Sequence, residues 1–338
     1  MNTEDNLCEK IKEICIEQLC TANTEKSPYK ARYADSSSDD KDNTKIEINE
    51  EDAREYIEAI IEPDEYKDYD DIFRRLLISG QNRNRMPKVI NFMGREEKFK
   101  EILCGNGSEK FSYKKVLQSF YNNTQNKDKA ANILLNKFKK NFKIKENITE
   151  ANQRQKKYKS LWQQYALFII DAALFMKEIC KNADVTEGID ENCHLKNFKA
   201  SLNKKASAEE DEYAVQKYVA NEISGIGFTL ACDFLKEIGY PIAKPDTHIV
   251  KYLRKKYPEK LKEKEEKLLN QKNSNLDTEE IAAVELMNDL AEKNNCSVYT
   301  LDKLIWLCCS GNYYKKGNFK KDIIIEPKSL RDLFLEKI

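Results

Sequence analysis

Two short segments of this 338-residue sequence combine residue types that could do chemistry. Ser224–Gly227, with the sequence SGIG, places two glycines two positions apart between two stretches of helical apolar periodicity. Glycines so spaced let a chain reverse tightly and expose bare N–H groups, which bind phosphate oxygens. Pro245–His248, with the sequence PDTH, places Asp246 nineteen residues after Gly227. A carboxylate there could act as a general base or stabilise a positive charge, although an Asp after a proline is also an ordinary helix N-cap.

The elements that carry these segments are expected to be helices. Charged residues make up 34% of the chain, with only 10 Gly and 7 Pro, and no run of alternating apolar residues predicts a strand. We therefore predict a nearly all-α protein. Apolar periodicity predicts helices near 4–20, 51–61, 68–79, 86–103, 112–122, 126–142, 155–180, 209–222, 229–238, 246–257, 277–294 and 301–314.

Charge is balanced overall but is unevenly placed along the chain. Residues 1–60 hold 16 acids against 8 bases, whereas 74–100 hold 8 bases against 2 acids and 127–160 hold 11 bases against 3 acids. The basic middle is either a set of solvated helix faces or a surface that binds phosphates.

The 10 cysteines include no CxxC pair, and the acidic N-terminus has no apolar export signal. We therefore expect reduced thiols and a cytoplasmic location. The most apolar segment, 161–179, contains Asp171, Lys177 and Glu178, so we interpret it as a buried central helix and expect no membrane partner.

The segments ISGIGFTLA (223–231) and KPDTHIVK (244–251) resemble the helix-hairpin-helix superfamily of DNA glycosylases, the endonuclease III-like family. The resemblance implies an all-α, two-lobed fold with a DNA-binding cleft between the lobes. It divides the chain into an acidic helix and linker (1–50), helices that join the second lobe (51–85), a helical barrel (86–245) with the helix-hairpin-helix at about 214–238, and a C-terminal segment (246–338) that returns to the second lobe. A charged stretch at about 258–279 is expected to be an insertion.

The resemblance also assigns roles to individual residues. Asp246 would stabilise the positive charge that develops on the sugar, or activate water. Gln81, in a Ser-x-Gln echo of the family, would fill the gap left by an extruded nucleotide; the alternative is a helix end followed by a polar loop. The residues expected to contact DNA are Gln81, Arg83, Arg85, Ser224, Gly225, Gly227, Thr229 and Lys251. Trp162 and Tyr165 are candidate walls of the base pocket, with Trp306 further along the chain, and the alternative for each is a place in the core.

Departures from the family pattern narrow the expected chemistry. Thr229 stands where lyase-active members carry a nucleophilic lysine, so a Schiff base is not expected. Cys296, Cys308 and Cys309 are too few for the family's iron–sulfur cluster. We expect no cofactor, apart from a monovalent cation that the hairpin could hold.

The sequence therefore predicts a monomeric, monofunctional DNA glycosylase acting on double-stranded DNA that contains a damaged or modified base. It would serve base-excision repair or attack modified foreign DNA. The alternative is a non-catalytic helix-hairpin-helix protein that binds DNA or RNA.

Overall fold

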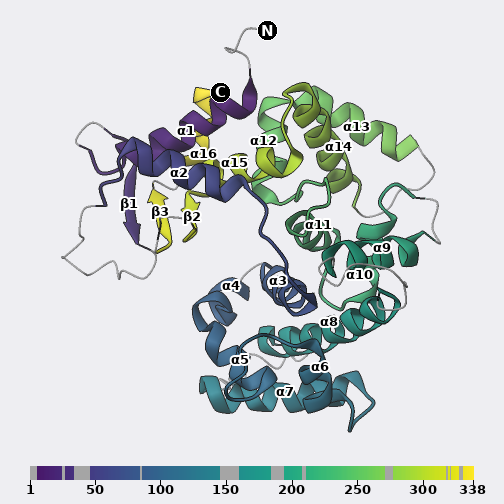
Figure 1. The fold of residues 1–338 in the computed structure, drawn as a ribbon. Coiled ribbons are helices and arrows are strands. Elements are labelled where there is room, and N and C mark those ends of the chain that lie inside the picture. Colours follow the sequence, from purple (N-terminus) through teal and green to yellow (C-terminus); the bar gives the residue numbers. More distant parts are fainter. Residues whose placement is uncertain are drawn as a thin grey trace, which may run out of the picture. The chain divides into compact units, whose positions relative to one another are not determined.

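The computed structural model describes residues 6–24, 27–33, 46–83, 86–144, 160–183, 194–207, 211–270, 277–316, 319, 321–326 and 330–338. The chain forms two compact units (Figure 1). Unit 1 combines Met1–Asp64 with Gly239–Ile338, and unit 2 comprises Glu65–Ile238.

Unit 2 is built around helix α8 (Leu161–Ala183), which is apolar on most of its surface and is covered by other helices. Two tighter or wider turns, a 3₁₀ turn at Met93–Arg95 and a π-helical turn at Leu117–Tyr121, interrupt the helical run. The remaining helices are α3 (Tyr69–Gln81), α4 (Met86–Ile90), α5 (Glu96–Cys104), α6 (Tyr113–Val116), α7 (Lys127–Phe142), α9 (His194–Ala206), α10 (Ala214–Glu222) and α11 (Phe228–Glu237).

Helices α3 and α8 approach each other closely at Gly80. A Cβ atom added there would lie 2.1 Å from Cζ of Phe168, a separation that real carbon atoms do not reach. Gly80 therefore lets the outer edge of the Phe168 ring approach the α3 backbone, and a larger residue would push the two helices apart.

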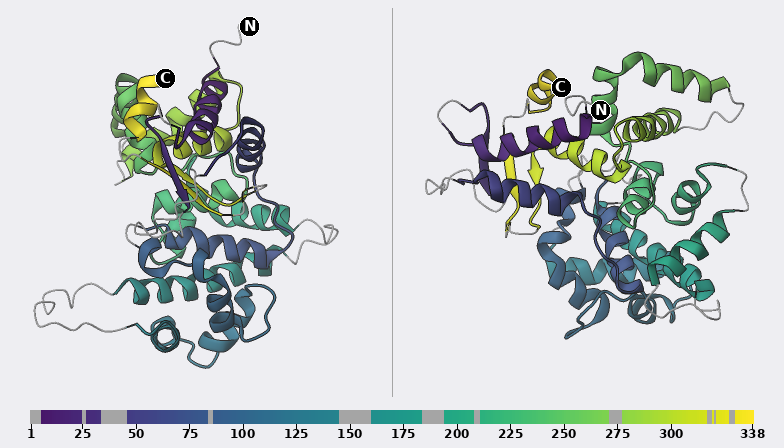
Figure 2. Two further views of the ribbon diagram at one scale, coloured as in Figure 1. Left: turned by 90° about the vertical axis from the view of Figure 1, so that its left-hand side faces the viewer. Right: turned by 45° about the horizontal axis from the view of Figure 1, so that its top comes forward.

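Unit 1 brings the two ends of the chain together. Its helices pack with α1 against α15, and its strands form one antiparallel sheet in the order β1-β3-β2. Figure 2 shows the purple N-terminal strand beside the yellow C-terminal strands. Tyr33 pairs with Ile323 and Asn312 pairs with Ile324, so the first strand is completed only by the C-terminal segment. The elements are α1 (Leu7–Thr21), β1 (Lys30–Tyr33), α2 (Glu50–Ile61), α12 (Thr247–Lys256), α13 (Pro258–Asn270), α14 (Thr278–Lys293), α15 (Val298–Ser310), β2 (Asn312–Tyr313), β3 (Ile323–Glu326) and α16 (Leu330–Lys337).

The prediction of a predominantly helical protein is confirmed, but the sheet of unit 1 was not predicted. Its strands are only two to four residues long, too short for an alternation of apolar residues to register. The stretch expected to be an insertion begins as the regular helix α13, and helices α9 and α16 were also missed. No helix in the described ranges has the length and apolar character needed to cross a bilayer.

The units are divided at other residues than those expected. Helix α3 belongs to unit 2, although 51–85 was expected to join the other lobe, and the second boundary follows Ile238 rather than residue 245. The reason for the first difference is the packing of α3 against α8 and α11, which includes the close approach at Gly80.

Candidate functional site

The SGIG segment forms a tight hairpin between α10 and α11. Gly225 has φ +88°, in the left-handed region where a side chain is strained, and the Ile226 N–H donates to the Ile223 carbonyl at 3.1 Å. Gly227 then caps α11, and its carbonyl accepts the N–H groups of Leu230 and Ala231. The turn itself therefore requires a glycine at 225.

Neither the backbone conformation nor any neighbouring atom requires a glycine at position 227. Its backbone is extended, at φ −98°, and an added Cβ would meet no atom within 4 Å. Within the described part of the chain, no group accepts the N–H of Gly227, Phe228 or Thr229. Such N–H groups at a helix N-terminus bind anions, and the missing side chain leaves room for a ligand to come close.

Arg83, which was predicted to contact DNA, lies next to this hairpin. Its Nη1 atom would be 3.5 Å from a Cβ at Gly225 and is 3.4 Å from Oε1 of Gln164. The guanidinium therefore adds a positive charge beside the exposed N–H groups. Arg85, predicted with it, lies outside the described residues.

The structure contradicts the role predicted for Gln81. The side chain is buried, with 5% exposed, and its Oε1 accepts the Phe92 N–H at 2.8 Å. A group that fills a gap in DNA must project from the surface, whereas this amide holds the segment that enters α5. The alternative of a helix end followed by a polar loop describes it better, because α3 ends at Gln81.

Trp162 and Tyr165 are also core residues, so the predicted base pocket is wrong. Trp162 stacks on Phe99 with ring centroids 6.2 Å apart, and the Tyr165 hydroxyl donates to the Leu77 carbonyl at 3.1 Å. Complete burial raises the pKa of the Tyr165 phenol well above its ordinary value. Neither ring has a face left for a base.

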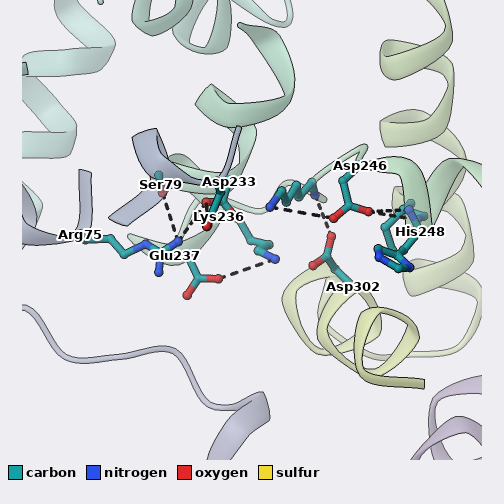
Figure 3. A network of polar contacts seen from close by, with 11 residues as sticks. Arg75, Ser79, Asp233, Lys236, Glu237, Asp246, His248 and Asp302 are labelled. Carbon is teal, nitrogen blue, oxygen red and sulfur yellow. Dashed lines mark hydrogen bonds and ion pairs between the residues drawn. The ribbon is translucent and has the colours of Figure 1, made fainter. Parts of the chain in front are cut away.

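Asp246 caps the N-terminus of α12 in unit 1 (Figure 3). Its Oδ1 accepts the N–H groups of His248 at 2.8 Å and Ile249 at 3.2 Å, and its Oδ2 lies 3.9 Å from Nζ of Lys244. The side chain is 16% exposed. One carboxylate oxygen is therefore fixed by the helix, while the other lies beside an ammonium group.

A buried carboxylate that the sequence did not single out positions this segment. Asp302, on α15 and 1% exposed, accepts the Lys244 N–H through Oδ2 at 2.7 Å (Figure 3). The chain is thus held two residues before Asp246 as well as by its own helix cap. The one sequence signal for Asp302 is its position four residues before Trp306, which places the two side chains on the same face of a helix.

Aromatic rings also gather at the start of α12 within unit 1. The His248 ring lies edge-on to Trp306 with centroids 6.3 Å apart, and Trp306 stacks on Tyr314 at 5.4 Å and 16°. Tyr314 is 52% exposed, which is unusual for so large a ring. Trp306 was predicted as a wall from its residue type, but Tyr314 and the contact with His248 were not.

Lys251 is exposed on α12, whose last turn adds Arg254, Lys255 and Lys256. Arg254 pairs with Glu279. From Lys251 onward, the helix that Asp246 caps therefore carries basic side chains, as a surface that faces phosphates would.

The described residues contain no group of three or more His, Cys, Asp or Glu side chains arranged to hold a metal ion. The C-terminal cysteines instead meet thiols of α1, because Cys308 Sγ lies 3.1 Å from Cys15 Sγ. A monovalent cation at the hairpin would have to bind main-chain carbonyls, and those of Ile223 and Gly227 already accept N–H groups. Because each carbonyl oxygen has a second lone pair, these bonds do not test the monovalent cation, which stays a prediction.

Comparison with known proteins returns no match of any kind: no protein-family model, no curated protein and no solved structure is significantly similar to this chain.

Proposed function

We propose that this protein is a monofunctional DNA glycosylase, which hydrolyses the N-glycosidic bond of a damaged or modified base in double-stranded DNA and leaves an abasic site. The observation that carries the proposal is Asp246, whose cap leaves Oδ2 beside Lys244 on a partly exposed side chain. Base-excision repair and attack on modified foreign DNA both use this reaction.

The hairpin supplies the grip on DNA. Its N–H groups at Gly227, Phe228 and Thr229 have no acceptor among the described residues, the space beside the Gly227 Cα is open, and Arg83 lies near Gly225. Extrusion of a nucleotide needs the flanking phosphates to be held, because unstacking a base costs a few kcal/mol. Exposed N–H groups and a guanidinium suit that task without reading the sequence.

Asp246 supplies the chemistry. As the bond between C1′ and the base nitrogen breaks, the base takes the electron pair and C1′ becomes positive; a carboxylate stabilises that charge. Water then adds to C1′ and gives a proton to Oδ2, while the departing base is protonated from solvent. Because Oδ1 accepts two N–H groups, the carboxylate is held in place and the reaction does not have to reorient it.

The absence of a lyase step follows from the residue at 229. Thr229 lies in the first turn of α11, where a lysine would be needed to form a Schiff base with the sugar. A hydroxyl cannot form this intermediate. Borohydride should therefore trap no protein on its DNA, and a trapped complex would contradict the proposal.

The rival function is a helix-hairpin-helix protein that binds DNA or RNA without cleaving it. One observation favours it: the two hydrogen bonds of Asp246 are those of an ordinary helix N-cap. On that interpretation the hairpin would be the whole functional site.

The deciding experiment incubates the full-length protein with duplexes that carry alkylated, deaminated, mismatched or bulky modified bases, and then reveals abasic sites with hot alkali. Strand breaks with one class of base would support the glycosylase. Tight binding without breaks across the whole panel would favour the rival.

Asp246→Asn is the matched variant, because asparagine caps helices as well as aspartate does. We expect it to keep its thermal stability and DNA affinity while base release falls at least about a thousandfold, in the range typical for loss of a main electrostatic group. Asp246→Ala is the control for the cap and should also lose about 1 kcal/mol of stability. Undiminished activity of Asp246→Asn would remove the mechanism.

A further inference from the structure

Helix α8 contains a buried charge in the middle of its apolar sequence. Asp171 is 1% exposed, and charged groups are almost never buried so fully unless they are paired. Its Oδ2 accepts the Ser224 N–H at 3.2 Å, and its Oδ1 lies 2.8 Å from Nζ of Lys127. The carboxylate therefore joins three parts of unit 2: α8, the start of α7 and the hairpin.

The contact with Ser224 fixes the hairpin at the residue before its strained glycine. Because this N–H donates inward to Asp171, it is not free to bind DNA, and the exposed N–H groups of the turn are those further along. The prediction that Ser224 contacts DNA then applies only to its exposed side chain.

Lys127 is an unexpected residue for its position. It is the first residue of α7, where the positive end of the helix dipole disfavours a cation. Its side chain is nevertheless 52% exposed and in contact with Asp171. The ammonium group is therefore open to solvent and paired with the same carboxylate that accepts the Ser224 N–H of the hairpin.

We infer that Asp171 is a positioning residue for the hairpin and that Lys127 is a further phosphate contact, held there by Asp171. This inference rests on the proposed function for the nature of the ligand. A negative charge directly behind an anion-binding turn opposes phosphate, since charges separated by less than a Debye length of about 8 Å are poorly screened. Lys127 cancels that charge and adds its own attraction, so the carboxylate can orient the turn without weakening the site.

A double-mutant cycle on the full chain tests this pair: wild type, Lys127→Met, Asp171→Asn and the double variant. Binding to a duplex with a tetrahydrofuran abasic analogue is measured by fluorescence anisotropy at several salt concentrations. Lys129→Met is the matched control, because Lys129 is exposed on the same helix turn.

We expect Lys127→Met to weaken binding about tenfold and to reduce the slope of log K against log salt by about 1, whereas Lys129→Met changes affinity less than about twofold. Asp171→Asn should bind about as well as wild type, because its amide oxygen still accepts the Ser224 N–H and because loss of the opposing charge offsets loss of the ion pair that holds Lys127. The double variant should recover to within about threefold of wild type, since the opposing charge is gone. A merely structural pair would not show this rescue.

Equal effects of the two lysine variants, or a double variant weaker than Lys127→Met, would overturn the inference. Hydrogen exchange at the hairpin gives an independent measure: Ser224 should lose protection in Asp171→Ala and keep it in Asp171→Asn. The cycle is separate from catalysis, because rescue in a protein that releases no base would refute the glycosylase and leave this inference standing. Base release without rescue would do the opposite, and a wild type that binds no duplex would overturn both.

Discussion

Asp171 in unit 2 and Asp302 in unit 1 are comparable residues with different consequences. Each is 1% exposed on a core helix, and each accepts a main-chain N–H from a functional segment, Ser224 at 3.2 Å and Lys244 at 2.7 Å. Asp171 holds a turn that offers N–H groups to a ligand, and its second oxygen meets the exposed Lys127. Asp302 holds the chain that leads to a single carboxylate.

The difference separates binding from catalysis. A turn that binds phosphate through several N–H groups can tolerate a small displacement, because the binding free energy is distributed over several hydrogen bonds. A catalytic carboxylate cannot, because a misplacement of about 1 Å can cost about a hundredfold in rate. Asp171 and Asp302 are thus two anchors with different roles. Removing Asp171 should therefore mainly affect binding, and removing Asp302 should mainly affect catalysis.

Of the substitutions that test this comparison, Asp302→Ala should have the largest effect. The unsatisfied Lys244 N–H should cost about 2 kcal/mol of stability, and loss of the Asp246 position should lower kcat for base release about a hundredfold with KM little changed. Asp171→Ala should cost similar stability but should act mainly through KM. Steady-state kinetics on one substrate distinguish them, and the same split between kcat and KM for both variants would abolish the comparison.

Gly80→Ala tests whether the two units behave as separate bodies. The added Cβ overlaps the Phe168 ring of the unit 2 core, so we expect the free energy of unfolding to fall by about 2–3 kcal/mol. In denaturant unfolding, the variant should lower the midpoint of the transition reported by Trp162 in unit 2 and should leave the midpoint reported by Trp306 in unit 1 unchanged. Trp162→Phe and Trp306→Phe backgrounds assign the signals, and a single shifted transition would mean that the units unfold together.

The two hairpin glycines offer a finer division between folding and binding. Gly225→Ala places a side chain at φ +88° and should cost about 1 kcal/mol of stability. Gly227→Ala, at φ −98° in open space, should leave stability unchanged and weaken duplex binding about tenfold, because the methyl group occupies the face that the phosphate approaches. Melting curves and anisotropy measure the two effects; a Gly227→Ala protein with normal affinity would mean that DNA does not approach this face.

Helical periodicity was enough to predict most of the helices and the turn at 224–227, because these features depend on residues close together in sequence. The core positions of Trp162 and Tyr165 could not be decided, because a ring on an apolar helix looks the same in sequence whether it stacks on a ligand or on Phe99. Gln81 failed for a similar reason: its partner, the Phe92 N–H, lies eleven residues away.

The roles of Asp171 and Asp302 could not be predicted from local sequence patterns. Asp171 and Asp302 act through main-chain groups 53 and 58 residues distant. The charge of Asp171 was visible in sequence, but only as an argument against a membrane span. Buried polar residues in apolar helices thus signal a partner without naming it.

The smallest effect is expected at Asp70, a half-buried carboxyl on α3 that belongs to neither functional segment. Burial, followed by the charge of Asp68, raises its pKa to about 6 from 3.8. The folded state therefore binds this proton more tightly than the unfolded chain, so the stabilisation is complete below about pH 4 and is lost as pH rises through about 6. Asp70→Asn removes the dependence and should be about 1 kcal/mol more stable than wild type at pH 8, after allowance for solvent screening, and equal to it at pH 3.5. Denaturant midpoints across that pH range measure the difference. Because the substitution changes neither Asp171 nor Asp302, duplex binding at pH 8 should stay unchanged. A loss of binding would show that α3 influences the hairpin and that the two anchors do not act alone.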